Sequence, residues 1–238
     1  MAPGRDVTSE TAIVPPRGPR RAPVPWHVRL PGTAVTIRAE PASPGRHAEL
    51  LHGWFHEPHV RRWWSARDLA GTRDRLARQC AAGHLVPWVV SAGGRPFGYV
   101  EAYRAADDPL ARAYPLDDAD RGWHVLVGPP DAIGSGLPRL LGRAVVARLL
   151  AEPGVERVVC EPDVRNERML AFCRALGHTR LATLDLPDKR AALLACTREA
   201  FASRWPGDIE AAAAPLTWRS STVRGAGDRD GDTGPGEG

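Results

Sequence analysis

A glycine-rich junction between an apolar strand and a helix is the feature of this sequence that most restricts its fold. Residues 123–127 (WHVLV) have the apolar, β-branched composition of a strand, which Gly128-Pro129-Pro130 ends. The loop Ile133-Gly134-Ser135-Gly136-Leu137-Pro138 follows. A long helix is expected at residues 138–151, since proline suits a first turn. Strand, short loop and helix in this order favour a layered domain in which helices cover a sheet.

The periodicities of the other segments alternate between strand and helix. Further strands are expected at residues 28–38, 85–91, 97–103 and 155–160, and two more on either side of residues 185–188. Further helices are expected at residues 47–55, 67–82 and 167–176, the last ended by Gly177. Gly93-Gly94 predicts a hairpin between the strands on either side of it. We therefore predict an α+β domain with a mixed sheet.

The two ends of the chain differ in composition from its centre. Residues 1–25 are rich in proline and arginine, and residues 220–238 are rich in glycine and aspartate, without apolar periodicity. We predict flexible tails there and one folded domain at residues 26–219. A chain of 238 residues, 43% of them hydrophobic, is long enough for one domain with a full core.

Charge and cysteine content restrict the possible partners. The net charge is only +4, and the arginines are scattered rather than gathered with aromatic residues, which argues against nucleic-acid binding. No segment approaches the ~20 apolar residues of a membrane-spanning helix. The cysteines lack the spacings of metal sites, so we expect no bound metal and reduced thiols in a cytoplasmic protein: Cys80, Cys160, Cys173 and Cys196.

The glycine-rich loop is a candidate anion site. Backbone N–H groups at the start of a helix lie at the positive end of its dipole, where a phosphate or pyrophosphate binds. No Lys-Ser or Lys-Thr pair follows the loop, so it is not a Walker loop. Taken alone, the pattern fits an ordinary strand-to-helix connection equally well.

His124 and Asp163 are the candidate catalytic side chains. His124 lies within an apolar strand, and Asp163 follows the expected strand at residues 155–160. If the two strands are parallel neighbours, both residues lie at the same end of the sheet, where a histidine and a carboxylate form a plausible general-base pair. The simpler alternative is that Asp163 or Asn166 only caps the following helix.

Four segments together resemble the GCN5-related N-acetyltransferase (GNAT) superfamily. They specifically resemble its siderophore-biosynthesis acyltransferases, which acylate the side-chain nitrogen of lysine or N6-hydroxylysine. The segments are residues 54–60 (WFHEPHV) with Trp63-Trp64, residues 121–129 (RGWHVLVGP), residues 161–169 (EPDVRNERM) and residues 185–193 (DLPDKRAAL). The resemblance runs from about Val28 to Trp205.

The resemblance implies a GNAT fold, with a mostly antiparallel sheet and an acyl-CoA cleft between two splayed parallel strands. It implies direct attack of an amine on the thioester of acyl-CoA, most often acetyl-CoA, without a metal. His124 and Asp163 match the family's catalytic positions. The expected CoA contacts are Val127, Gly134, Ser135, Gly136, Leu137, Arg139, Asn166 and Phe172. The expected acceptor contacts are His59, Trp63, Trp64, Glu101, Tyr103 and Lys189. Packing or surface roles remain open for these acceptor-side residues.

Two departures from the superfamily pattern affect the CoA loop. Ile133 replaces the usual Gln or Arg, and Pro138 replaces a small residue and lacks an N–H. Arg139 and Arg143 could compensate. A third departure is Cys173, which stands where many members have a tyrosine acid; a small apolar role suits this thiol better.

Several alternatives stay open at this stage. The chain could be an aminoglycoside 6′-N-acetyltransferase-like enzyme, another small-amine acetyltransferase, or a CoA-binding protein with degenerate activity. The expected partners are CoA, a small amine or hydroxylamine and siderophore-pathway enzymes. The sequence is compatible with a monomer or a homodimer.

Overall fold

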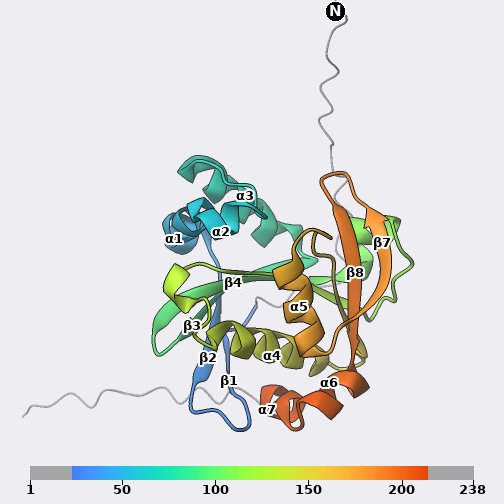
Figure 1. The fold of residues 1–238 in the computed structure, drawn as a ribbon. Helices are drawn as coiled ribbons and strands as arrows, with labels where there is room; N and C mark the ends of the chain where they lie inside the picture. Colours follow the sequence, from blue (N-terminus) through green and yellow to red (C-terminus); the bar gives the residue numbers. More distant parts are fainter. Residues whose placement is uncertain (1–22, 214–238) are drawn as a thin grey trace, which may run out of the picture.

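An eight-stranded mixed sheet forms the centre of the protein in a computed structural model, which describes residues 23–213 (Figure 1). The strand order is β1-β2-β3-β4-β5-β6-β8-β7. Neighbouring strands are antiparallel except β5 and β6, which are parallel. The predicted α+β class and the mostly antiparallel sheet are therefore confirmed. The strands are β1 (Trp26–Arg29), β2 (Thr36–Pro41), β3 (Leu85–Ala92), β4 (Arg95–Arg104), β5 (Arg121–Val127), β6 (Arg157–Cys160), β7 (Thr179–Asp185) and β8 (Arg190–Thr197).

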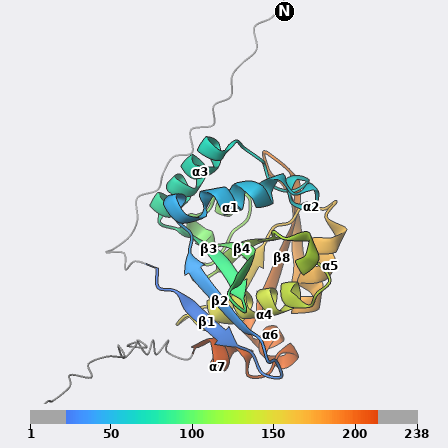
Figure 2. The ribbon, with the colours of Figure 1, turned by 90° about the vertical axis from the view of Figure 1, so that its left-hand side faces the viewer.

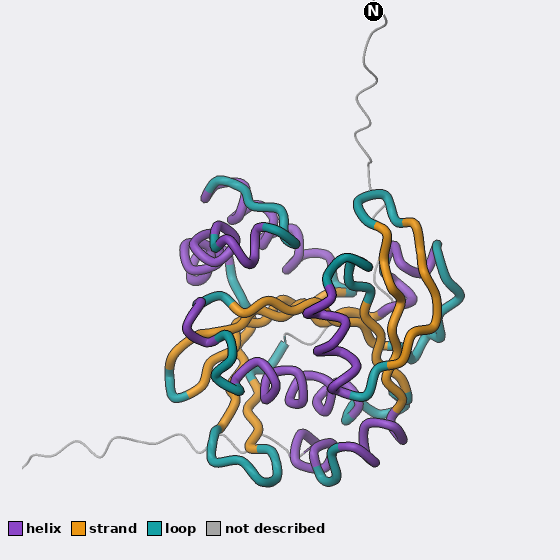
Figure 3. The backbone as a smooth tube through the Cα atoms, viewed as in Figure 1, coloured by secondary structure: helices purple, strands orange, loops and turns teal. Residues whose placement is uncertain are grey.

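Helices cover both faces of the sheet, as the views in Figures 2 and 3 show. The predicted helices at residues 47–55, 67–82, 138–151 and 167–176 correspond to α1, α3, α4 and α5, whereas α2, α6 and α7 were not predicted. The predicted tails lie outside the described residues, apart from residues 23–25, and so do residues 214–219. The helices are α1 (Pro44–His56), α2 (Pro58–Arg61), α3 (Leu69–Ala82), α4 (Leu137–Leu150), α5 (Glu167–Leu176), α6 (Arg198–Arg204) and α7 (Asp208–Ala213).

Alternation along the central strands divides the core into two layers. On β3, Val89 packs with the cluster under α1–α3, whereas its neighbour Val90 packs with the cluster under α4 and α5. On β5, Leu126 belongs to the first cluster and Trp123 to the second. Side chains of a strand point alternately to the two faces of the sheet, so β5 presents His124 to the α1–α3 side.

Side-chain caps fix where the helices begin. Asp68 accepts a hydrogen bond from the Gly71 N–H at 2.8 Å and starts α3, and Asn166 accepts one from the Met169 N–H at 3.1 Å and starts α5. Gly177 ends α5 in the left-handed region with φ 106°, as predicted. The capping expected for Asn166 is therefore present.

The single strand predicted at residues 28–38 is wrong. The segment forms β1 and β2, which pair with each other in an antiparallel hairpin that places Val28 opposite Ile37. Gly32 adopts a φ of 72° in the turn after Pro31, a conformation that favours glycine. Apolar alternation continues on both sides of this turn, which is why the sequence resembled one continuous strand.

The parallel strands β5 and β6 separate soon after they begin. Only Arg121 and Gly122 of β5 pair with β6, opposite Val158 and Val159. The Gly128 N–H donates to the Phe97 carbonyl of β4 at 2.9 Å. Hydrogen-bonded and non-hydrogen-bonded pairs alternate along an antiparallel ladder, so the backbone groups of Val125 and Val127 face away from β4 into the gap. The expected pair of splayed parallel strands is confirmed.

Candidate active site

Two adjoining cavities lie beside the separated end of β5. The larger cavity has a volume of about 940 Å³ and the smaller cavity about 440 Å³. Val125 of β5 lines both. The other residues that line both cavities come from the segment after α2 and from the start of α5: Arg62, Trp63, Trp64, Arg165, Asn166 and Met169. A molecule in one cavity would therefore lie next to a molecule in the other.

The larger cavity joins the exposed backbone of β5 to the start of α4. Val127, Gly134, Asn166 and Phe172, all predicted to contact CoA, line it. Ser135, Gly136, Leu137 and Arg139 lie at the same helix start but do not line the cavity. Gly134 and Gly136 have φ values of 81° and 87°, so the loop needs glycine at both positions. Pro138 and Ile133, the two departures from the superfamily loop, line the cavity as well.

Arg139 and Arg143 differ in their availability at the start of α4. Arg139 is exposed and has no carboxylate partner within residues 23–213. Arg143 instead makes two hydrogen bonds of 2.8 Å to Asp208 of α7, and its guanidinium lies 4.3 Å from the centre of the Trp205 ring. The idea that Arg143 compensates for the altered loop is wrong, because its charge is directed toward α7.

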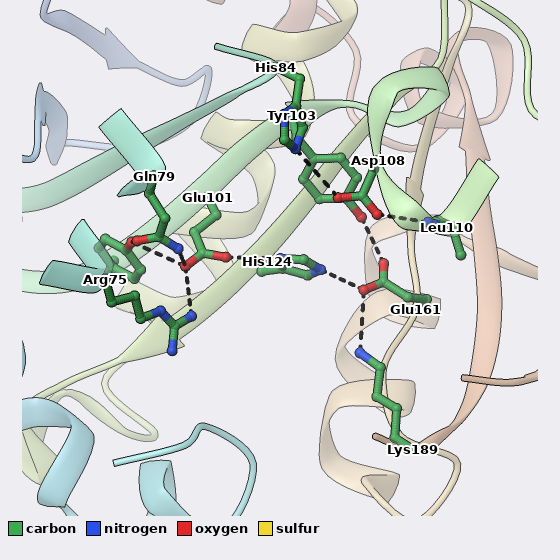
Figure 4. Close-up of polar contacts among 11 residues, drawn as sticks. Arg75, Gln79, His84, Glu101, Tyr103, Asp108, Leu110, His124, Glu161 and Lys189 are labelled. Atoms are coloured by element: carbon green, nitrogen blue, oxygen red, sulfur yellow. Dashed lines mark hydrogen bonds and ion pairs between the residues drawn. The ribbon is translucent and has the colours of Figure 1, made fainter. Parts of the chain in front are cut away.

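The smaller cavity contains His124 between two buried carboxylates. His124 Nδ1 lies 3.1 Å from Glu101 Oε2, and His124 Nε2 lies 2.5 Å from Glu161 Oε1 (Figure 4). Glu101 stands directly opposite His124 in the β4–β5 register, and Glu161 follows the last residue of β6. The two carboxylates are 3% and 6% exposed, respectively.

Each carboxylate has further partners that keep it charged. Glu101 accepts hydrogen bonds from Arg75 at 3.1 Å, from Tyr99 at 3.1 Å and from Gln79. Burial would raise the pKa of Glu101, but the hydrogen bond and charge of His124, followed by Arg75, lower it to about 2.

Glu161 is held in the same way by a phenol and an ammonium. It accepts hydrogen bonds from Tyr103 at 2.7 Å and Lys189 at 3.3 Å. Burial opposes ionisation, yet His124, Lys189 and Tyr103 place the pKa of Glu161 well below its usual range. For His124, burial disfavours the charge, but the charges and hydrogen bonds of Glu161 and Glu101 raise its pKa to about 10.

Asp163 lines the smaller cavity with His124 but does not hydrogen-bond to it. Its carboxylate binds Arg165, with Arg165 Nη2 to Asp163 Oδ2 at 2.6 Å and Arg165 Nε to Asp163 Oδ1 at 2.9 Å. The hydrogen bond from Arg165 lowers the pKa of Asp163 to about 2. The direct His124–Asp163 pairing considered from the sequence is replaced by contacts of His124 with Glu101 and Glu161.

The predicted acceptor contacts divide between the cavities and the interior. Glu101, Lys189, Trp63 and Trp64 line the smaller cavity. Tyr103 is 2% exposed and lines neither cavity, so the predicted contact of Tyr103 with an acceptor is corrected to a buried support of Glu161. Its ring fills the space beside Gly122, where a Cβ atom would lie 2.0 Å from it.

His59 lines the larger cavity rather than the smaller one. It was predicted on the acceptor side, but its Nε2 lies 2.9 Å from the Val127 carbonyl oxygen at the separated end of β5. The Nε2–H donates this hydrogen bond. Helix α2 is thereby attached to the backbone edge that faces the gap between β5 and β6. This position follows from the direction of α2, which the sequence did not predict, and contact of His59 with an acceptor stays a prediction.

The role of Glu161 was missed in the sequence, although a signal was present. An acidic residue directly after a buried strand is costly unless it has a partner. That cost marks Glu161, but the identity of its partner required the parallel pairing of β5 with β6. Cys173 is fully buried, with its sulfur 3.5 Å from that of Cys160, and this core position favours its apolar role.

Neither a metal site nor a membrane span is found in the part of the chain that the structure describes. Residues 23–213 contain no group of three or more His, Cys, Asp or Glu side chains placed to hold a metal ion. Within the same residues, no helix has the length and apolar character to cross a membrane.

Comparison with known proteins gives a consistent set of sequence matches. Residues 43–186 match a family model described as an acetyltransferase (GNAT) domain. A lysine N-acyltransferase MbtK from Mycobacterium sp. (strain MCS) is 31% identical over 183 residues, which cover 76% of this chain and 75% of that protein. An N(6)-hydroxylysine O-acetyltransferase from Escherichia coli is 31% identical over 162 residues, which cover 67% of this chain and about half, 51%, of that protein.

Solved structures have the same fold. An uncharacterised protein from Bacillus halodurans superposes with a TM-score of 0.74 at 28% identity, covering 78% of this chain and 96% of that chain. An aminoglycoside acetyltransferase, AAC(6')-Ib in complex with coenzyme A, superposes with a TM-score of 0.63 at 26% identity, covering 70% of this chain and 98% of that chain.

Proposed function

Because this chain belongs to the GNAT acetyltransferase family and is an acyltransferase, we propose that it acylates the side-chain amine or hydroxylamine of a lysine-like precursor in siderophore biosynthesis. The acyl donor is acyl-CoA, with acetyl-CoA first among the candidates. The observation that carries this proposal is the meeting of two cavities at Val125, one beside a helix start and one lined by His124 and Asp163. The names of the relatives support the substrate class.

The larger cavity has features that fit acyl-CoA. The Val125 and Val127 backbone faces it, and the glycine loop at the start of α4 offers amides at the positive end of a helix dipole. Val127 N–H is the proposed donor to the thioester oxygen, which becomes more negative during attack. Phe172 supplies an apolar wall. Ile133 and Pro138 reduce the number of donors available to the phosphates.

The smaller cavity has features that fit a positively charged or polar acceptor. The nitrogen of the acceptor attacks the thioester carbon, the N–C bond forms, and the thiolate leaves with the electrons of the C–S bond. We assign His124 as the charged group beside the attacking nitrogen and Asp163 as the carboxylate that orients this nitrogen. The nitrogen must be neutral to attack, whereas free lysine with a pKa of ~10.4 is protonated at neutral pH. An N-hydroxylated nitrogen is less basic and meets this need more easily.

An acceptor and donor panel tests the proposal. Thiol release is measured from acetyl-, succinyl-, octanoyl- and palmitoyl-CoA, each offered lysine, N6-hydroxylysine, N-hydroxycadaverine and kanamycin. Turnover confined to the lysine-like acceptors is expected, and the productive donor identifies the acyl chain. Turnover with kanamycin alone would contradict the proposal.

A second candidate is an aminoglycoside or other small-amine acetyltransferase. The specific observation in its favour is the structural similarity to AAC(6')-Ib in complex with coenzyme A. A third candidate, a CoA-binding protein with degenerate activity, rests on Ile133 and Pro138 in the loop. CoA binding by calorimetry without turnover in any arm of the panel would favour this third candidate.

A further inference from the structure

Within residues 23–213, His124 is the only side chain that contacts both buried carboxylates of the smaller cavity, Glu101 and Glu161. Glu101 comes from β4 and approaches Nδ1, whereas Glu161 comes from the end of β6 and approaches Nε2 (Figure 4). A neutral imidazole has one N–H donor and one acceptor nitrogen, and an ionised carboxylate only accepts. Two ionised carboxylates on the two nitrogens are therefore both satisfied only if the ring carries both protons.

The ionised state of the carboxylates has support independent of His124. Arg75 of α3 binds Glu101, and Lys189 of the β7–β8 loop binds Glu161. The hydroxyl groups of Tyr99 and Tyr103 donate to Glu101 and Glu161, respectively. Each carboxylate thus has a second cation and a neutral donor, so protonating either one would break several hydrogen bonds.

The other groups around the ring do not reverse this charge balance. Asp108, after β4, Asp163, after β6, and Asp188, in the β7–β8 loop, are the additional acids near His124, and each favours a positive charge on it. Arg61 and Arg62 line the same cavity and oppose that charge, but both are exposed and screened by solvent. Asp163 is already paired with Arg165, and Asp108 lies 3.9 Å from His84. The edge of Trp64 and the ring of Tyr103 pack against the imidazole without adding charge.

We propose that Glu101 and Glu161 are positioning residues that hold His124 as an imidazolium with both N–H groups donating. His124 then enters the reaction as a fixed positive charge whose two N–H groups are both engaged, not as the base. This inference rests on the proposed function for its chemistry, but the charge state itself is a property of the free protein.

The consequence for the reaction is that the acceptor nitrogen reaches His124 already neutral. As the N–C bond forms, negative charge develops on the thioester oxygen and then on the sulfur as the C–S bond breaks. Three cations, His124, Arg75 and Lys189, outnumber the two carboxylates, and the net positive charge of this cluster stabilises that negative charge. The proton released by the nitrogen goes to solvent water, and solvent protonates the departing thiolate. His124 neither gains nor loses a proton overall.

The first test is a titration of His124 by NMR in the full-length protein without substrates. The imidazole signals of His124, assigned by comparison with His124→Gln, are followed from pH 5.5 to 9.5. We expect the doubly protonated form through pH 9. A titration of wild-type His124 near pH 6.5, or a neutral ring at pH 7.5, would overturn the proposal whatever the acceptor proves to be.

The second test changes the carboxylates one at a time. Glu101→Gln and Glu161→Gln keep the shape but remove the charge, so the pKa of His124 should fall to about 6.5 or below, the range of an ordinary histidine. At pH 7.5, kcat should fall about tenfold or more with KM for acyl-CoA within about twofold, and should recover partly at lower pH, where the ring is protonated again. Glu101→Asp and Glu161→Asp should preserve protonation.

The matched control is Asp120→Asn. Asp120 is another buried carboxylate paired with an arginine, Arg157, but it lines neither cavity. This control should leave the His124 titration unchanged, even if it lowers stability. Glutamine variants with a wild-type titration and pH–rate profile would refute the positioning role. If a glutamine variant does not fold, the wild-type titration and the aspartate variants decide the question.

An acceptor panel without turnover would not affect these titrations. A failure of the proposed function and a failure of this inference can therefore be distinguished.

Discussion

His124 and Asp163 line the same cavity but have different partners. His124 lies between Glu101 and Glu161, whereas Asp163 binds Arg165, whose side chain is 76% exposed. The exposed Arg165 side chain can move away when another hydrogen-bond donor replaces it, because solvent weakens an ion pair with one exposed partner. Asp163 is therefore available to an incoming nitrogen, while the partners of His124 are fixed by burial.

His124→Ala and Asp163→Asn should each lower kcat by about 100-fold or more. Under the proposed function, the first removes the positive charge beside the attacking nitrogen, and the second removes the carboxylate that orients it. Steady-state kinetics with the productive pair of the acceptor panel measure the effect. His56→Ala, in an exposed histidine that lines neither cavity, serves as the control. Wild-type rates in both variants would contradict the assignment.

His178 is a buried histidine whose pKa is lowered, whereas that of His124 is raised. It is 2% exposed, and neither ring nitrogen has a hydrogen-bond partner within the described residues. Burial lowers its pKa to about 4, against 6.5 for an ordinary histidine. The His178 ring binds a proton more tightly in the unfolded chain than in the folded protein. The free energy of unfolding therefore falls as the pH drops from 6.5 toward 4.

His178→Phe should reduce the loss of stability between pH 6.5 and pH 4, which for this residue amounts to about 3 kcal/mol. The ring volume is kept, and only the titration is removed. Urea unfolding at several pH values measures the difference from the wild type, and His27→Phe provides an exposed control. Equal slopes for the wild type and His178→Phe across this range would refute the prediction.

The start of α4 is the element in which the sequence differs most from the superfamily pattern. Gly134 and Gly136 of the loop have positive φ values, and Pro138 occupies the first turn of α4 and has no N–H. The helix start is suited to an anion by its dipole while lacking one of its donors. Replacing Pro138 alone would therefore change the affinity of this helix start for the phosphates of CoA.

Pro138→Ala should strengthen acyl-CoA binding by about tenfold, which is the contribution of one hydrogen bond to a charged group. Calorimetry with a non-hydrolysable acyl-CoA analogue measures it. Pro130→Ala, in the same loop but outside the lining of the larger cavity, is the control. Unchanged or weaker binding in Pro138→Ala would exclude the missing N–H as the limiting feature.

Elements that were predicted accurately have a local signal in the sequence, such as a capping residue or a pair of glycines. Helix α5 was predicted with its observed bounds because Asn166 caps it and Gly177 ends it. The hairpin of β3 and β4 was predicted from Gly93-Gly94. The β1–β2 hairpin was missed because its turn lies within an apolar alternation, and α2 is too short to give a periodic pattern.

Contacts between distant segments attach α6 and α7 to the rest of the protein: α7 packs against α4 and β1, and α6 packs against β8. In Figure 1 these helices lie below α4. Asp208 of α7 is fully buried and receives both hydrogen bonds from Arg143, whose side chain is 11% exposed. Trp205 packs against the guanidinium of Arg143. The C-terminal helices thus belong to the same core as α4.

Asp208→Ala should lower the free energy of unfolding by about 3 kcal/mol, because it leaves the Arg143 charge buried without a partner. The double variant Arg143→Met with Asp208→Leu should regain most of that loss. Urea unfolding measures both, and kcat should change by less than about twofold, since neither residue lines a cavity. An unchanged unfolding midpoint in Asp208→Ala would contradict the prediction.

The arrangement of the whole sheet explains which parts of the site could be predicted. His124, Asp163 and the glycine loop were selected because their segments resemble the GNAT pattern, and in the structure His124, Asp163 and Gly134 line the two adjoining cavities. The partners of His124 depend on β4 and β6 lying on either side of β5, and Glu101 and Glu161 are 60 positions apart in the chain. No local pattern contains that strand order, and so the charge state of His124 required the structure.

The common wall of the two cavities has a consequence for inhibitor design. Val125, Asn166 and Met169 border both spaces. A single compound that links the sulfur of CoA covalently to a lysine-like amine would occupy both spaces together. Such a conjugate loses its translational and rotational freedom only once, so it should bind far more tightly than either half.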